Sequence, residues 1–218
     1  MTKVKICGIT NVEDARVAVE AGADAIGFIF AESPRRVTPE RARDILNEVP
    51  LGRTVAVGVF VDENPDRMCE VAEMVGLTVL QLHGDESPEI VRELRSFTFD
   101  VVKSFRVGAE RDVTGRLRDY DPTAFLLDTY VPSQPGGTGK TFDWRLAVDA
   151  KRFGRVILAG GLGVDNVREA IATVSPYGVD ASSRLEVRPG AKDHDLVRTF
   201  IRRVKSRAKG VETDPWPR

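Results

Sequence analysis

The chain has 218 residues, and its 32 Lys and Arg residues nearly balance 33 Asp and Glu residues, which excludes the basic excess typical of nucleic-acid-binding proteins. Only two cysteines and two histidines occur, so the sequence offers neither a disulfide framework nor a spacing of metal ligands. No apolar segment reaches membrane-spanning length and the N-terminus lacks a signal-peptide core, so we expect a cytoplasmic protein without membrane contact.

Short apolar segments alternate with amphipathic segments along the chain, which predicts eight strands and eight helices. The predicted strands are 4–7, 25–30, 54–60, 79–83, 101–105, 124–128, 156–159 and 179–182. The predicted helices are 12–21, 39–48, 65–75, 88–96, 110–119, 144–150, 165–174 and 193–209. Strict alternation favours a closed parallel (βα)8 barrel over an open sheet. We expect this barrel to occupy residues 1–209 as one domain, and the tail 210–218 to fray.

The segment KVKICGIT is predicted to be a short strand that Gly8 ends, just before the first helix. Cys7 therefore lies where a strand meets a helix, at the end of a parallel barrel that carries active sites. A free cysteine is also often a small buried hydrophobic residue, so position alone leaves both roles open. Lys5 shares a strand face with Cys7, so we expect it to point into the barrel and to lower the pKa of the thiol, or to pair with Asp180.

Two adjacent arginines follow the second predicted strand, in the stretch Ser33-Pro34-Arg35-Arg36. Guanidinium groups at the mouth of a site suit a carboxylate or a phosphate. The alternative is a solvated loop.

Polar residues recur at positions that the strand alternation turns toward the barrel interior. They are Gln81, His83, Asp128, Asp180 and Ser182. One interpretation is a structural layer of paired polar groups, and the other is the floor of a site; the two are compatible. Asp128 ends the apolar strand Leu126-Leu127, a position typical of catalytic acids in barrels, although an aspartate there can also cap a helix or anchor a loop.

The stretch 136–141, GGTGKT, is similar to a nucleotide-binding P-loop, but that motif requires a glycine where Gln134 stands. We instead expect Gly137 and Gly139 to belong to a flexible loop that closes over a substrate.

The loops after the seventh and eighth predicted strands bind phosphate in many barrels. Here they contain Gly160 and Gly161, which allow close approach of the backbone to an anion, and Ser182 and Ser183, which add hydroxyl donors. An ordinary tight turn is the alternative for the two glycines.

The motifs KICGIT, GFIF, SPR, GVF, QLHG, LLDT, GGTGKTFDW, AGGL and KDHD occur in this order between residues 4 and 204. In this the chain resembles the phosphoribosylanthranilate isomerase family. The resemblance implies a cofactor-free TIM barrel that converts N-(5′-phosphoribosyl)anthranilate to 1-(2-carboxyphenylamino)-1-deoxyribulose 5-phosphate in tryptophan biosynthesis. It also implies a small phosphosugar as the binding partner and a monomer or homodimer.

The resemblance assigns roles to individual residues. Cys7 would be the general base, Asp128 the general acid, and Arg35 the partner of the anthranilate carboxylate. The phosphate would be bound by Gly160, Gly161, Ser182 and Ser183. Strand alternation and the glycine-rich loop, rather than the resemblance, lead us to expect that Gln81, His83, Gly137 and Gly139 contact the substrate and that Lys5 and Asp180 support the site. No residue is expected to bind a metal.

The sequence departs from the family where SSG usually follows the eighth strand and Arg184 replaces the glycine. A side chain disfavours positive φ, so either the turn does not require it or the loop differs, and Arg184 could add a charge for the phosphate. The competing functions are another phosphosugar enzyme, a catalytically silent phosphate-binding barrel and a thiol redox protein. Another phosphosugar enzyme would require metal ligands or a lysine–glutamate pair. A silent barrel would have lost Cys7 or Asp128, and a thiol redox protein would carry a Cys-x-x-Cys motif.

Overall fold

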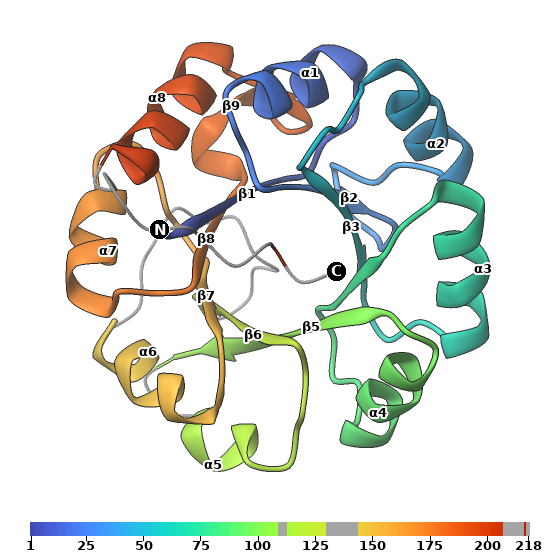
Figure 1. Cartoon of the computed structure of the whole chain (residues 1–218), viewed down its shortest axis with the longest axis vertical. Helices are drawn as coiled ribbons and strands as arrows, with labels where there is room; N and C mark the ends of the chain where they lie inside the picture. The colour runs from blue at the N-terminus through green and yellow to red at the C-terminus, as the bar shows by residue number, and fades with distance from the viewer. Residues whose placement is uncertain (109–112, 130–143, 207–215, 217–218) are drawn as a thin grey trace.

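The computed structural model describes residues 1–108, 113–129, 144–206 and 216. Eight parallel strands pair in chain order and close into a barrel, with β8 hydrogen-bonded to β1 (Figure 1). The strands are β1 Lys3–Cys7, β2 Ala25–Ile29, β3 Val55–Phe60, β4 Val79–Leu82, β5 Asp100–Val107, β6 Ala124–Thr129, β7 Val156–Leu158 and β8 Gly178–Ala181. The predicted closed (βα)8 barrel is confirmed.

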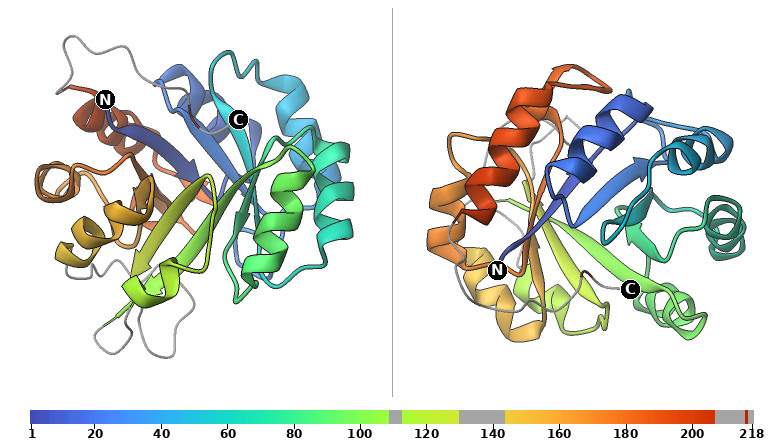
Figure 2. Two further views of the ribbon diagram at one scale, coloured as in Figure 1. Left: turned by 60° about the horizontal axis from the view of Figure 1, so that its bottom comes forward. Right: turned by 45° about the horizontal axis from the view of Figure 1, so that its top comes forward.

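The α-helices of the described residues form a ring around the strands, as Figures 1 and 2 show. They are α1 Val12–Glu20, α2 Pro39–Glu48, α3 Pro65–Val75, α4 Pro88–Ser96, α5 Val113–Leu117, α6 Arg145–Ala150, α7 Val167–Val174 and α8 His194–Lys205. None of them is long and apolar enough to cross a membrane.

Local signals fix where the helices begin. In α2 and α3 a proline occupies the first turn, and the side chains of Thr38 and Asn64 accept hydrogen bonds from the backbone N–H groups of Arg41 and Asp66 (3.2 and 2.8 Å). The proline needs no backbone partner at this position, and the cap satisfies a donor that the helix leaves open. These caps determine where the preceding βα loops end.

Three helices differ from the prediction by more than one residue at an end. The helix α7 begins at Val167 rather than at 165, because Asn166 bonds to the backbone of Gly161 and Gly163 and holds the preceding residues in a turn. The helix α5 is shorter than 110–119, of which 110–112 lie outside the described residues. The helix α8 ends at Lys205, short of the predicted 209.

The segment between β8 and α8 contains elements that the sequence analysis missed. A 3-10 turn, η2 Ser183–Leu185, leads into a hairpin of β9 Glu186–Arg188 and β10 Ala191–Lys192. A second 3-10 turn, η1 Lys151–Phe153, follows α6. The hairpin turns at Pro189-Gly190, where Gly190 has φ +79°, a conformation that glycine adopts without strain.

The barrel interior is apolar near the strand starts and polar higher up. The apolar layer is formed by Ala25, Val57, Val79, Val102, Ala124, Leu126 and Ile157, together with Trp216. Lys5, Gln81, Ser104 and Asp180 are buried as well. The inward polar layer expected from strand alternation is therefore present.

Trp216 is the one tail residue that the structure describes, and its side chain is 2% exposed. It packs on the apolar layer, with its ring centroid 6.3 Å from that of Tyr177, and closely approaches Gly178. Burial of the indole favours this position of Trp216, whereas the fraying expected for 210–218 stays a prediction, since the other residues of the tail lie outside those described.

We expect Trp216→Ala to lower the free energy of unfolding by about 3 kcal/mol, the cost of emptying a buried aromatic site. Turnover should be unchanged, because Trp216 lies at the strand starts, opposite the cavity described below. Urea unfolding followed by circular dichroism measures the effect. Phe97→Ala, at a 52% exposed aromatic residue, is the control. Equal midpoints for the two variants would contradict the prediction.

Candidate active site

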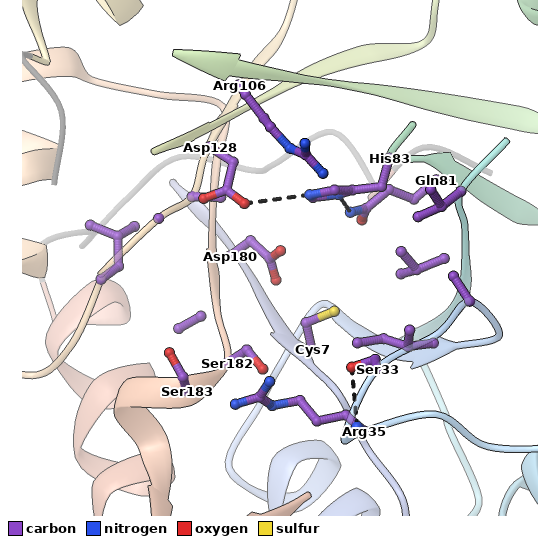
Figure 3. Close-up of a pocket in the computed structure, with 18 of the residues that line it drawn as sticks. Cys7, Ser33, Arg35, Gln81, His83, Arg106, Asp128, Asp180, Ser182 and Ser183 are labelled. Carbon is purple, nitrogen blue, oxygen red and sulfur yellow. Dashed lines mark hydrogen bonds and ion pairs between the residues drawn. The ribbon is translucent and has the colours of Figure 1, made fainter. Parts of the chain in front are cut away.

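A cavity opens at the carboxyl ends of the strands (Figure 3). Its lining includes these predicted site residues: Cys7, Arg35, Gln81, His83, Asp128, Gly160, Gly161, Asp180, Ser182 and Ser183. Lys5 lies beneath it, and Gly137 and Gly139 lie outside the described residues. Residues 176 positions apart thus converge because parallel strands end on one face of the barrel.

Cys7 lies above a buried ion pair. The Nζ of Lys5 is 3.0 Å from Oδ2 of Asp180, and the two residues are register partners on β1 and β8. The Lys5 side chain is 1% exposed, so its charge is almost fully withdrawn from water. The structure realises both alternatives for Lys5, since it pairs with Asp180 and also interacts with the thiol.

The pKa of Cys7 is raised, not lowered. Burial of the thiol and the negative charge of Asp180 raise the pKa, and together they outweigh the charge and hydrogen bond of Lys5, which lower it. The expected effect of Lys5 thus has the right sign but does not decide the net direction. In the resting protein, Cys7 keeps its proton to a higher pH than a free cysteine does.

Gly27 provides the space that Cys7 and Lys5 occupy. A Cβ at position 27 would lie 2.8 Å from the sulfur of Cys7 and 3.2 Å from Nζ of Lys5. Any side chain there would push the thiol and the ammonium group out of place, because real Cβ contacts are not this short.

Asp128 lies across the cavity from Cys7, as Figure 3 shows. The Nε2 of His83 is 3.4 Å from Oδ2 of Asp128, and Nδ1 of His83 is 2.9 Å from Nε2 of Gln81. When the Gln81 amide donates to Nδ1, the proton of a neutral His83 is on Nε2 and points at the carboxylate. Gln81 on β4 thus orients His83, just after the strand, and His83 in turn faces Asp128.

The loop that carries His83 is held by a buried carboxylate. Glu86 accepts hydrogen bonds from Nζ of Lys103 (2.7 Å) and from the backbone N–H groups of Gly84 and Asp62 (3.0 Å each). The loops after β3 and β4 are thus fixed to β5, which keeps His83 near Asp128.

Arg106 lines the cavity and is the register partner of Asp128. The sequence analysis missed it because the fifth strand was predicted to end at residue 105, whereas β5 continues to Val107. Had the predicted strand included residue 106, alternation would have placed Arg106 on the same inward face as Ser104.

The two loops expected to bind phosphate lie side by side. Gly160 and Gly161 have φ +81° and +64°, which glycine tolerates. Arg184 lies in the turn η2. Its φ is not positive, so the turn does not need a glycine at this position. Its guanidinium contacts the Gly161 carbonyl (3.1 Å) and both carboxylate oxygens of Asp165 (2.9 and 2.8 Å). Asp165 therefore balances the charge of Arg184 in this structure, and a contact of Arg184 with the phosphate stays a prediction.

Arg35 forms a charge cluster that the sequence analysis missed. Its Nε and Nη2 contact the carboxylate of Glu186 at 2.8 and 2.7 Å, and Nζ of Lys192 contacts the same carboxylate at 2.7 Å. Lys192 belongs to the KDHD motif, which gave the only signal for this cluster. Arg36 is exposed and does not line the cavity, so Arg35 is the arginine of this pair placed to meet a ligand.

The arrangement suits acid–base chemistry on an anionic substrate. A thiol and a carboxyl group face each other across the cavity, an arginine lies on one side, and glycine and serine loops lie on another (Figure 3). Within the described parts of the chain, no group of three or more His, Cys, Asp and Glu side chains is placed to hold a metal.

Replacing Lys5 tests its influence on the thiol. In a Cys69→Ser background, which leaves Cys7 as the one thiol, Lys5→Met should raise the Cys7 pKa further, because a positive charge favours the thiolate. The pH dependence of alkylation by iodoacetamide measures this. The variant should also lose about 3–5 kcal/mol of stability, because Asp180 loses its partner.

The double variant Lys5→Met/Asp180→Asn removes both charges and should recover part of that stability. An alkylation profile that is unchanged in a well-folded Lys5→Met protein would exclude Lys5 from the tuning of Cys7.

Comparison with known proteins identifies the family. The model of the family described as N-(5′-phosphoribosyl)anthranilate (PRA) isomerase matches residues 4–203. An N-(5′-phosphoribosyl)anthranilate isomerase from Geotalea uraniireducens is 52% identical over 94% of this chain and 99% of its own. The crystal structure of phosphoribosyl anthranilate isomerase from Thermotoga maritima is 45% identical, with TM-score 0.86, and covers 94% of this chain and 100% of its own.

Another solved phosphoribosyl anthranilate isomerase, in complex with reduced 1-(o-carboxyphenylamino)-1-deoxyribulose 5-phosphate, is 42% identical, with TM-score 0.83, over 94% of this chain and 100% of its own. Sequence and fold therefore agree over nearly the whole chain. The chain belongs to the N-(5′-phosphoribosyl)anthranilate isomerase family.

Proposed function

We propose that the protein isomerises N-(5′-phosphoribosyl)anthranilate by general acid–base catalysis, with Cys7 as the base and Asp128 as the acid. The isomerase activity predicted from the sequence motifs agrees with the family and its named relatives. The observation that carries the residue roles is the placement of Cys7 and Asp128 on opposite sides of one cavity, which two arginines and the glycine and serine loops after β7 and β8 also line.

The reaction begins with ring opening. Asp128 delivers a proton to the ribose ring oxygen, the C1′–O bond breaks, and the anilino nitrogen supplies the electron pair that forms a Schiff base. The Cys7 thiolate then removes the C2′ proton, which gives an enolamine, and this tautomerises to the ketone. An acid and a base on opposite faces of the sugar suffice for both proton transfers.

The raised pKa of Cys7 has two opposite effects. Burial reduces the fraction of thiolate at neutral pH, and it makes the thiolate that does form a stronger base. Lys5 limits the first effect, because its charge partly compensates for the lost hydration.

The substrate's two anionic groups match the charges of the cavity. Arg35 lies where it can bind the anthranilate carboxylate, and Gly160, Gly161, Ser182 and Ser183 can donate backbone and hydroxyl hydrogen bonds to the phosphate. The ligand in the solved relative carries both groups. Contacts from Gly137 and Gly139 stay a prediction, since both lie outside the described residues.

Assembly and location also stay predictions. We propose a monomer or homodimer; one solved relative is described as a monomeric form of a dimeric enzyme. Cys7 and Cys69 are both free thiols, which fits a reducing cytoplasm. Light scattering on the purified protein distinguishes the two assemblies.

The direct test of the activity is incubation with freshly made phosphoribosylanthranilate, followed by the loss of anthranilate-type fluorescence. Enzyme-dependent loss that saturates with substrate supports the proposal. A well-folded protein without this activity would contradict it.

Cys7→Ser should fold normally and lose turnover by about 10²–10⁴-fold, because a hydroxyl is a far weaker base than a thiolate. The measurement is kcat in the fluorescence assay. Cys69→Ser, on the outer helix α3, is the control and should keep normal turnover. A near-normal kcat for Cys7→Ser would exclude Cys7 as the base.

Asp128→Asn should retain binding of a reduced product analogue, since the amide is nearly isosteric, and should lose ring opening. Calorimetric titration with the analogue separates binding from turnover. Asp44→Asn, at an exposed site on α2, is the control. Lost affinity together with high residual turnover would make Asp128 a binding residue.

A further inference from the structure

The hairpin β9–β10 brings two charged side chains, those of Glu186 and Lys192, to the Arg35 side of the cavity. The Glu186 side chain is 3% exposed and lies between Arg35 and Lys192. Resting on the function proposed above, we propose that Glu186 is a positioning residue that fixes the direction of the Arg35 guanidinium for the substrate's carboxylate.

The contacts define which edge of the guanidinium is used. Nε of Arg35 lies 2.8 and 3.1 Å from the two oxygens of Glu186, and Nη2 lies 2.7 Å from one of them. A guanidinium has five N–H donors in a rigid plane, so this bidentate contact takes one edge and directs the other terminal nitrogen away from Glu186. Figure 3 shows the Arg35 side chain extending toward Ser182, and both residues line the cavity.

The stem of Arg35 is fixed as well. A Cβ at Gly8 would lie 2.7 Å from Cδ of Arg35 and 3.0 Å from Oγ of Ser182, so the arginine crosses directly over the loop that follows Cys7. Both ends of this side chain are therefore held, the stem by the glycine loop and the tip by Glu186. An arginine held in this way loses little rotamer freedom when it binds an anion.

Lys192 keeps Glu186 ionised and in place. Its Nζ is fully buried, 2.7 Å from Oε1 of Glu186 and 3.4 Å from the carbonyl and hydroxyl oxygens of Ser182. Burial raises the pKa of Glu186, but the hydrogen bond from Arg35 and the charge of Lys192 more than compensate and hold it below its usual value. One carboxylate between two cations leaves the cluster with a net positive charge, which favours an anionic ligand.

The hairpin itself is anchored to the first βα unit. The backbone N–H of Lys192 donates to Oδ2 of Asp14 (2.9 Å), and the hydroxyl of Thr10 donates to the Gly190 carbonyl (2.5 Å). Glu186 is therefore presented by a fixed support, and its contact with Arg35 joins the loops after β1, β2 and β8.

A double-mutant cycle tests the inference. Glu186→Gln keeps the shape of the side chain and removes its charge, so kcat/KM should fall about tenfold, mainly through a higher KM, the scale of one charged hydrogen bond. In an Arg35→Ala background the same substitution should change kcat/KM by less than about twofold, because its effect passes through Arg35. Equal losses in both backgrounds would overturn the proposal.

Two further variants separate positioning from folding. Glu186→Asp retains the charge on a shorter side chain and should restore part of the lost KM effect, even if Glu186→Gln lowers the melting temperature. Glu89→Gln removes an exposed ion pair with Arg92 on α4 and should leave kcat and KM unchanged. Absence of isomerase activity in the unmodified protein would contradict the proposed function, whereas normal KM in folded Glu186→Gln and Glu186→Asp would contradict the positioning role alone.

Discussion

The interior of a closed barrel admits little water, so every charge that points into it needs a partner there. The pair of Lys5 and Asp180 meets this requirement where β1 and β8 close the barrel, with 3.0 Å between the charged atoms. Removing one partner would leave a buried charge, at a cost of several kcal/mol. The surroundings of Cys7 depend on this pair, because the thiol lies directly above it.

The same constraint recurs around the cavity, where several cations next to the site have a carboxylate partner. Glu86 holds Lys103 beneath the His83 loop, Glu186 lies between Arg35 and Lys192, and Asp165 pairs with Arg184 beside Gly161. These pairs orient groups that water would otherwise leave free to move. Such preorganisation allows binding energy to be used for the reaction rather than for ordering the site.

Much of the barrel and part of the site could be predicted from the sequence. Period-two alternation placed Lys5, Gln81 and Asp180 inward, and the motifs identified Cys7, Asp128 and Arg35. These signals are local, since they depend on neighbours within one strand or loop.

What could not be predicted depends on contacts between distant segments. Glu186 lies on a strand of three residues, too short for a periodic pattern, and its role appears only once Arg35, 151 positions away, lies beside it. The pKa of Cys7 is the outcome of burial against the charge of Lys5, and their relative sizes follow from packing rather than from sequence spacing. Arg106 was not predicted, because the fifth strand was expected to end at residue 105, whereas β5 continues to Val107.

The closure of β1 on β8 also has a consequence for how the protein is made. The chain is synthesised from its N-terminus, and Lys5 and Asp180 are 175 positions apart. At about 5–20 residues per second, the first strand waits roughly 10–35 s for its partner strand. Cys7 leaves the ribosome among the first residues, yet its ionic surroundings are completed almost last. The Cys7 thiol of the nascent chain therefore lacks its ionic surroundings until the last fifth of the chain is translated, and its raised pKa arises only when the barrel closes.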